Sequence, residues 1–129
     1  MAISTGSAIE FFGTQDTLGT SSAARADGAF SQASDLSTWI NTDNAVSASV
    51  TLLANWTTTA PDANTSVNLY LRLLDVEGTN DGTIPDANFQ HTYVGSFPLN
   101  DATGAQYITI DIGLPNSVTS QNYEFYIEN

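Results

Sequence analysis

The amino-acid sequence predicts an all-β fold, an antiparallel β-sandwich or jelly roll with an extended N-terminal arm. Three observations lead to this prediction. From residue 45 onward, apolar and polar residues alternate with the period of two that marks half-buried strands. Runs of Gly, Pro, Asn and Asp separate these stretches at short intervals. No stretch has the period of a helix. We therefore divide the 129 residues into an arm at 1–28 and a β-sandwich (jelly-roll-like) domain at 29–129.

The first 28 residues differ from the rest because they are rich in Gly, Ser, Thr and Ala and lack sustained alternation. Such a segment buries too little apolar surface to order itself. It nevertheless carries a small apolar cluster, Ile9, Phe11 and Phe12. Two interpretations stay open: the cluster packs into the core of its own domain, or it docks on a neighbouring subunit. In the second case these three residues form a partner interface.

The domain is expected to contain about six or seven short strands. Weaker candidates lie around Phe30 and Trp39, and stronger ones cover 46–57, 67–76, 89–99, 107–114 and 123–129. Alternation in the two longest stretches predicts one buried face with Val46, Ala48, Val50, Leu52, Ala54 and Trp56, and another with Val67, Leu69, Leu71 and Leu73. In the stretch 89–99, it groups Phe89, His91, Tyr93 and Phe97 on one face.

Charge narrows the range of partners. The sequence contains fourteen acidic residues but only two basic ones, Arg25 and Arg72, and its net charge is −12. Because phosphate backbones and anionic lipids attract Lys and Arg, we expect neither nucleic acid nor membrane as a partner, but a basic or neutral protein. The N-terminus lacks the pattern of a signal peptide, and no window reaches transmembrane length. The absence of cysteine excludes disulfides and thiolate metal sites.

The stretch 74–86, LDVEGTNDGTIPD, concentrates the largest number of candidate metal ligands. Counted from Asp75 as a calcium loop, the sixth residue is Asn80 where Gly is needed, and the twelfth is Asp86 where Glu is usual. We therefore interpret this stretch as a connection between strands, without a metal. Its Asn80–Gly82 turn is expected to supply backbone angles with positive φ.

Catalytic residues and cofactors are not expected. His91 is the single histidine, and its alternation with aromatic residues predicts a position on a strand face in or near the core. Asp75 and Asp111 can form the carboxylate pair of a glycosidase only if their strands are neighbours. Tyr70 lies opposite the apolar face of its strand; if exposed beside Asn68, it would favour a carbohydrate site.

Three stretches of the C-terminal half, the loop GTNDGTIP, the strand and turn YVGSFPLND and the ending YEFYIEN, resemble small β-rich virion proteins of tailed bacteriophages. The resemblance does not reach residues 1–65. It implies a sandwich or jelly roll on the capsid surface and an arm that clamps neighbouring subunits. The cluster Ile9–Phe12 is the part of this chain to which that arm corresponds.

From this resemblance we expect a non-enzymatic capsid decoration (cement) protein, made in the host cytoplasm and incorporated into the virion. Its expected partners are the major capsid protein and copies of itself, because weak contacts gain strength when arm and domain bind together. The alternatives are a carbohydrate-binding β-sandwich module and an accessory protein of the phage neck or tail.

Overall fold

The structure is a computed structural model that describes residues 7–11, 14–19, 28–31, 38–76, 79–115 and 119–129. Within these ranges every regular element is a β-strand, which confirms the all-β prediction. They are β1 (Ser7–Phe11), β2 (Thr14–Gly19), β3 (Trp39–Ile40), β4 (Ser47–Trp56), β5 (Ser66–Leu74), β6 (Tyr93–Pro98), β7 (Gly104–Gly113) and β8 (Asn122–Glu128). The described residues thus include no helix long and apolar enough to span a membrane.

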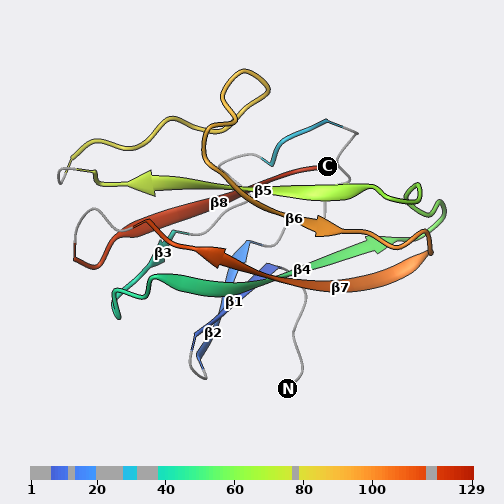
Figure 1. The fold of residues 1–129 in the computed structure, drawn as a ribbon, viewed down its shortest axis with the longest axis horizontal. Coiled ribbons are helices and arrows are strands. Elements are labelled where there is room, and N and C mark those ends of the chain that lie inside the picture. Colours follow the sequence, from blue (N-terminus) through green and yellow to red (C-terminus); the bar gives the residue numbers. More distant parts are fainter. Residues whose placement is uncertain (1–6, 12–13, 20–27, 32–37, 77–78, 116–118) are drawn as a thin grey trace.

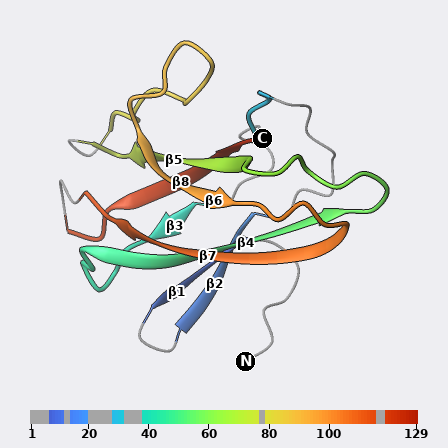
Figure 2. The ribbon, with the colours of Figure 1, turned by 45° about the vertical axis from the view of Figure 1, so that its right-hand side comes forward.

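The strands form two four-stranded antiparallel sheets, which Figures 1 and 2 show as stacked layers. Sheet A has the order β2-β1-β4-β7, and sheet B has the order β3-β8-β5-β6. Apolar side chains from β4 and β7 of sheet A share one buried cluster with side chains from β3, β5, β6 and β8 of sheet B. This arrangement is consistent with the predicted β-sandwich.

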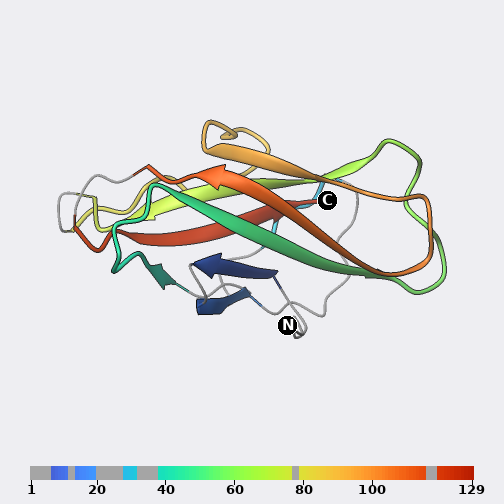
Figure 3. The ribbon, with the colours of Figure 1, turned by 60° about the horizontal axis from the view of Figure 1, so that its bottom comes forward.

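Strands β3 to β8 pair in a nested order. The first pairs with the last (β3 with β8), the second with the second-last (β4 with β7), and the middle two pair with each other (β5 with β6). A further ladder between β5 and β8 completes sheet B. The β4–β5 and β6–β7 connections therefore lie side by side at one end of the molecule (Figure 3), where the Leu99 N–H donates to the Thr65 carbonyl.

The predicted alternation matches the buried faces of the two central strands except at Val46, which precedes β4 and is 76% exposed. On β4, Ala48, Val50 and Leu52 are buried, and on β5 the buried residues include Val67 and Leu69. Sequence alone did not predict how closely the sheets approach each other. A Cβ added to Gly95 of β6 would lie 2.7 Å from Ile110 Cδ1 of β7, so any larger residue would require the Ile110 side chain to shift.

The N-terminal segment contains two strands where the sequence predicts none. β1 and β2 form an antiparallel hairpin, and β1 pairs with β4 through Ala8–Thr51, Ile9–Val50 and Glu10–Ser49. Figure 3 shows this hairpin along one side of the molecule. The described residues therefore do not confirm an extended arm separate from the sheets. Ile9 and Phe11 lie in β1, and Phe12 lies outside the described residues.

The prediction for the stretch 89–99 is wrong in two respects. The strand begins only at Tyr93, and exposed His91 lies in the preceding connection, its ring centroid 4.7 Å from that of Phe89. In addition, the register between β5 and β6 shifts beside Tyr70, so Tyr93 and Phe97 do not share a face. A bulge inserts one extra residue and reverses the alternation beyond it, which no sequence pattern reveals here.

The weak strand candidates upstream are much shorter than expected. Around Phe30 the chain makes an isolated bridge to Glu128, and Ser31 donates its N–H to the Ile127 carbonyl. Around Trp39 it forms the two-residue strand β3 against the start of β8. These two contacts cover the edge of β8 at both of its ends.

Candidate functional site: the outer face of sheet B

The outer face of sheet B carries a row of polar and aromatic side chains that sequence reasoning did not assemble. Along β5 and β8, alternate residues point away from the core, and the register brings these residues opposite one another. The resulting cross-strand pairs are Asn68–Glu128, Tyr70–Tyr126 and Arg72–Glu124. We call these six residues the outer-face ladder.

Glu128 receives two hydrogen bonds at one end of the ladder. The Tyr70 hydroxyl donates to Glu128 Oε2 at 2.7 Å, and Asn68 Nδ2 donates to the same oxygen at 3.1 Å. The network continues onto β6, where Ser96 Oγ donates to Asn68 Oδ1 at 2.7 Å and lies 2.8 Å from the Tyr93 hydroxyl. One carboxylate thus holds β5 and β8 together, and its network extends to β6.

Glu124 has the same role at the other end. Its Oε2 accepts from Arg72 Nη1 at 2.9 Å and from the Tyr126 hydroxyl at 2.9 Å. Arg72 and Glu124 side chains are 15% and 16% exposed, so water screens this ion pair less than a surface pair. Arg72 is the single Lys or Arg in the described part of the chain. Its charge is therefore paired with Glu124 inside the ladder.

Both ladder tyrosines are buried although they face outward. Tyr70 is 2% exposed and Tyr126 is 0% exposed, and the Phe30 ring packs 5.2 Å from that of Tyr70. Burial, followed by the hydrogen bond to Glu128, raises the pKa of Tyr70 to about 12. Burial and the hydrogen bond to Glu124 likewise raise the pKa of Tyr126 to about 12. Burial opposes the charge of Arg72, but Glu124 raises the pKa of Arg72 above its ordinary value.

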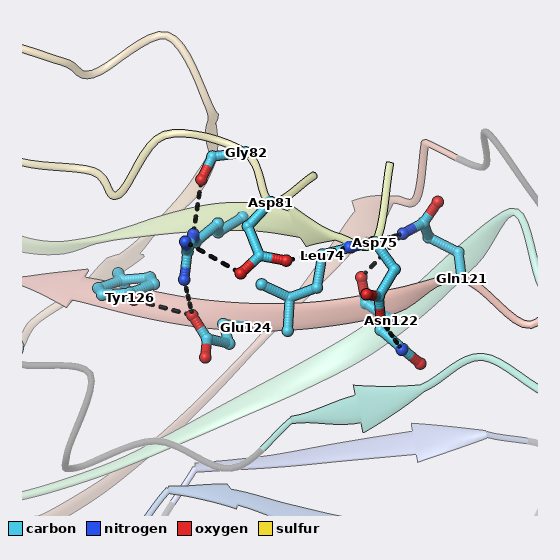
Figure 4. Close-up of polar contacts among 9 residues, drawn as sticks. Leu74, Asp75, Asp81, Gly82, Gln121, Asn122, Glu124 and Tyr126 are labelled. Carbon is cyan, nitrogen blue, oxygen red and sulfur yellow. Dashed lines mark hydrogen bonds and ion pairs between the residues drawn. The ribbon is translucent and has the colours of Figure 1, made fainter. Parts of the chain in front are cut away.

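The acidic connection after β5 is bound to the sheet through the same arginine (Figure 4). Arg72 Nε donates to the Gly82 carbonyl at 2.7 Å, and Arg72 Nη2 lies 3.5 Å from Asp81 Oδ2. The other oxygen of Asp81 accepts the Asp75 N–H at 3.1 Å. Asn122 Nδ2 in turn donates to Asp75 Oδ2 at 2.6 Å. These carboxylates are hydrogen-bond acceptors that fix a loop, as the interpretation of a connection requires.

Gly82 serves this connection differently from the prediction. Positive φ occurs at Asp75, with a φ of 53°, and not at Gly82. Gly82 instead packs directly on β5, where its N–H donates to the Leu73 carbonyl at 2.7 Å and an added Cβ would meet that carbonyl oxygen at 3.0 Å. The glycine is needed for close approach and not for a turn. The described residues contain no group of three metal-ligating side chains, and Glu77 lies outside them.

The structure separates the other residues that the sequence analysis considered. Asp75 directly follows β5 of sheet B, whereas Asp111 lies on β7 in sheet A and accepts a hydrogen bond from Ser49. Their strands are not neighbours, so the proposed carboxylate pair does not form. Tyr70 is buried, so the exposed Tyr70–Asn68 platform for a carbohydrate is also wrong. The exposed aromatic of this face is Tyr93, which is 51% exposed.

Sequence reasoning missed Glu124 and Glu128. The signal was present in the ending YEFYIEN, whose alternate residues Glu124, Tyr126 and Glu128 form the polar face of a strand. Pairing them with Asn68, Tyr70 and Arg72 required the register of β8 against β5. That register depends on contacts between segments far apart in the sequence.

Comparison with known proteins finds no matching family model, no matching curated protein and no matching solved structure.

Proposed function

We propose that this chain is a non-enzymatic capsid decoration protein of a tailed bacteriophage, which stabilises the head by binding several coat subunits. The main observation behind the proposal is that the acidic side chains serve as structural hydrogen-bond acceptors. Asp75, Asp81, Glu124 and Glu128 all accept hydrogen bonds that join strands or fix a loop. Titratable groups employed in this way support a role as a rigid structural module.

The nested strand pairing supports the jelly-roll form of the sandwich. A jelly roll is a long antiparallel hairpin rolled onto itself, so its strands pair first with last and inward from there. The pairs β3–β8, β4–β7 and β5–β6 follow this order. The long β5–β6 connection, from residue 75 to residue 92, lies at the centre of the nest. We propose a jelly roll in which this connection stands where a fourth strand pair, inside the β5–β6 pair, would complete the nest.

We further infer that the β1–β2 hairpin is the arm, with Ile9, Phe11 and Phe12 as its partner interface. β1 is joined to β4 at only three paired positions. A ladder this short can be exchanged, so the hairpin of one subunit can pair with β4 of its neighbour instead. Arm and domain then bind two subunits at once, which multiplies weak contacts.

The test is to purify virions of the source phage and to determine whether the protein copurifies with intact, DNA-filled heads. Particles made without it should lose heat resistance, and adding the purified protein back should restore that resistance. Finding the protein in the lysate but never in particles would overturn the proposal. Location on the neck or tail alone would support the accessory-protein alternative.

A carbohydrate-binding role is the second candidate, favoured by the exposed ring of Tyr93 beside Ser96 and Asn68. An exposed aromatic next to hydroxyl and amide groups can stack on a sugar ring and bond its hydroxyls. Screening on a glycan array should give a signal that Tyr93→Ala removes. An array without any signal would leave the decoration role as the better proposal.

A further inference from the structure

One long strand edge of the molecule has neither the bulge nor the proline that commonly prevents pairing with other chains. β7 ends sheet A, and among the described residues it pairs only with β4. Its ten residues pair in a continuous register without a bulge, and it contains neither Pro nor Lys. Native proteins commonly protect edges with these residues or with bulges.

The neighbouring edge, β6 in sheet B, is protected in this way. Its register against β5 is interrupted by a bulge, and it ends at Pro98. The bond from the Leu99 N–H to the Thr65 carbonyl shows that, between the bulge and the end of β6, Gly95 and Phe97 direct their backbone groups toward β5, so Pro98 faces the free edge. Proline has no N–H to offer there. The contrast singles out β7.

The same reasoning identifies which backbone groups of β7 face outward. The Leu114 N–H donates to the Val46 carbonyl, which makes these two residues a hydrogen-bonded pair of the antiparallel ladder. Such pairs recur at every second residue. The even-numbered residues of β7 therefore bond to β4. Ala105, Tyr107, Thr109, Asp111 and Gly113 direct their N–H and C=O groups to the free edge.

The side chains along this edge define what an added strand would need. On the inner side, Ile108 and Ile110 are only partly buried, whereas Ile112 is 4% exposed. Apolar residues on the added strand would cover the first two. On the outer side, Tyr107 is 57% exposed, and Asp111 is also exposed. Polar or cationic residues fit that side.

We propose that the β7 edge accepts an antiparallel strand from a partner protein, in which apolar residues alternate with polar residues that include Lys or Arg. Charge favours a cationic partner over a second copy, because each chain carries a net charge of −12 and its described cation, Arg72, is paired with Glu124. Strand addition of this kind gains affinity from backbone bonds and specificity from alternate side chains. The inference does not rest on the proposed function, because any extended cationic partner could use this edge.

The test uses the full chain and a synthetic peptide in which Val alternates with Lys and Thr. In an NMR titration the peptide should shift the amide signals of Tyr107, Thr109 and Asp111 and slow their hydrogen exchange. The same peptide with Glu in place of Lys should bind at least about tenfold more weakly, since it adds like charge.

Two comparisons isolate the backbone bonds. Thr109→Pro removes one outward N–H, and Thr109→Val is its matched control, because both lose the hydroxyl contact with Thr51. The Pro variant should bind about tenfold more weakly than the Val variant. The second comparison leaves the protein unchanged. N-methylation of the peptide at its Lys and Thr positions, which lie opposite the outward groups, should abolish binding, and N-methylation at its Val positions should not.

Absence of binding at millimolar peptide would overturn the proposal, as would equal binding of the Glu peptide or of the two N-methylated peptides. Concentration-dependent shifts at β7 without any peptide would show that the occupant is a second copy and would also overturn it.

Discussion

Among single side chains, Arg72 connects its own strand to two other segments of the described chain. It joins β5 to β8 through Glu124 and to the β5–β6 connection through Gly82. Arg72→Ala should lower the free energy of unfolding by roughly 1–3 kcal/mol, because it leaves a largely buried carboxylate without its cation. Urea unfolding of the variant measures this loss.

Asp81→Asn is the matched control for the ion pairs of Arg72, because its amide oxygen can still accept the Asp75 N–H. The Asp81 side chain is 47% exposed and lies 3.5 Å from the guanidinium, so this pair should contribute less than about 0.5 kcal/mol. If both variants lose the same stability, the Glu124 contact is not the main contribution of Arg72.

The two ladder tyrosines make stability depend on alkaline pH. Their pKa rises from the ordinary 10.0 to about 12 in the folded chain. Between these values the unfolded chain releases protons that the folded chain retains, so the free energy of unfolding falls as pH rises. Below pH 10 the contribution is fully present. Unfolding curves measured at successive pH values should show this decline.

The double variant Tyr70→Phe with Tyr126→Phe should make the alkaline decline less steep. Tyr107→Phe is the control, because it removes a tyrosine hydroxyl outside the ladder, from a ring that is 57% exposed. An equal slope in the double variant and the parent would mean that other groups cause the decline.

At the scale of elements, Gly95 determines how closely β6 approaches β7. The added methyl of Gly95→Ala would lie 2.7 Å from Ile110 Cδ1, the end of a flexible side chain, so we expect destabilisation near the low end of overpacking, about 1 kcal/mol. Ile110→Val removes that same carbon atom. The double variant should therefore be more stable than the sum of the two single effects predicts. Strict additivity in thermal unfolding would contradict this contact.

Continuous alternation made the central strands predictable. In β4 and β5 every second residue is apolar, and Val50, Leu52, Val67 and Leu69 are buried as expected. Other features of the fold depend on contacts that a local pattern does not contain. β1 and β2 have weak alternation and are ordered by pairing with each other and with β4. The bulge beside Tyr70 reverses a face without any local signal.

The candidate site was less predictable than the strands. Outward positions of Asn68, Tyr70 and Arg72 follow from alternation, but their partners on β8 follow from a register across more than fifty residues of chain, since Arg72 and Glu124 are separated by 52 positions. The exposure of Tyr70 was predicted wrongly for the same reason. Tyr70 faces outward and is buried because Phe30 and Tyr93 pack against it.

At the scale of the whole molecule, the question is whether the N-terminal hairpin belongs to one subunit or to the contact between two. The nested pairs β3–β8, β4–β7 and β5–β6 do not use β1 or β2. Deleting residues 1–20 should therefore leave a folded β domain whose assembly is weakened. Phe11→Ser with Phe12→Ser should have the same effect, because each ring contributes roughly 1.5–3 kcal/mol when it is buried.

Two measurements decide between the interpretations of this hairpin: thermal unfolding of the truncated domain, and its oligomeric mass together with its retention on particles. A domain that stays folded but no longer assembles would support the arm. A domain that unfolds on truncation would contradict it, because the hairpin would then be part of the internal core. One pairing is relevant to both interpretations. Ile9 of the hairpin pairs with Val50 of β4, which is fully buried. If the neighbour supplies β1, that pairing forms between two chains, and the stability of the domain should then depend on protein concentration.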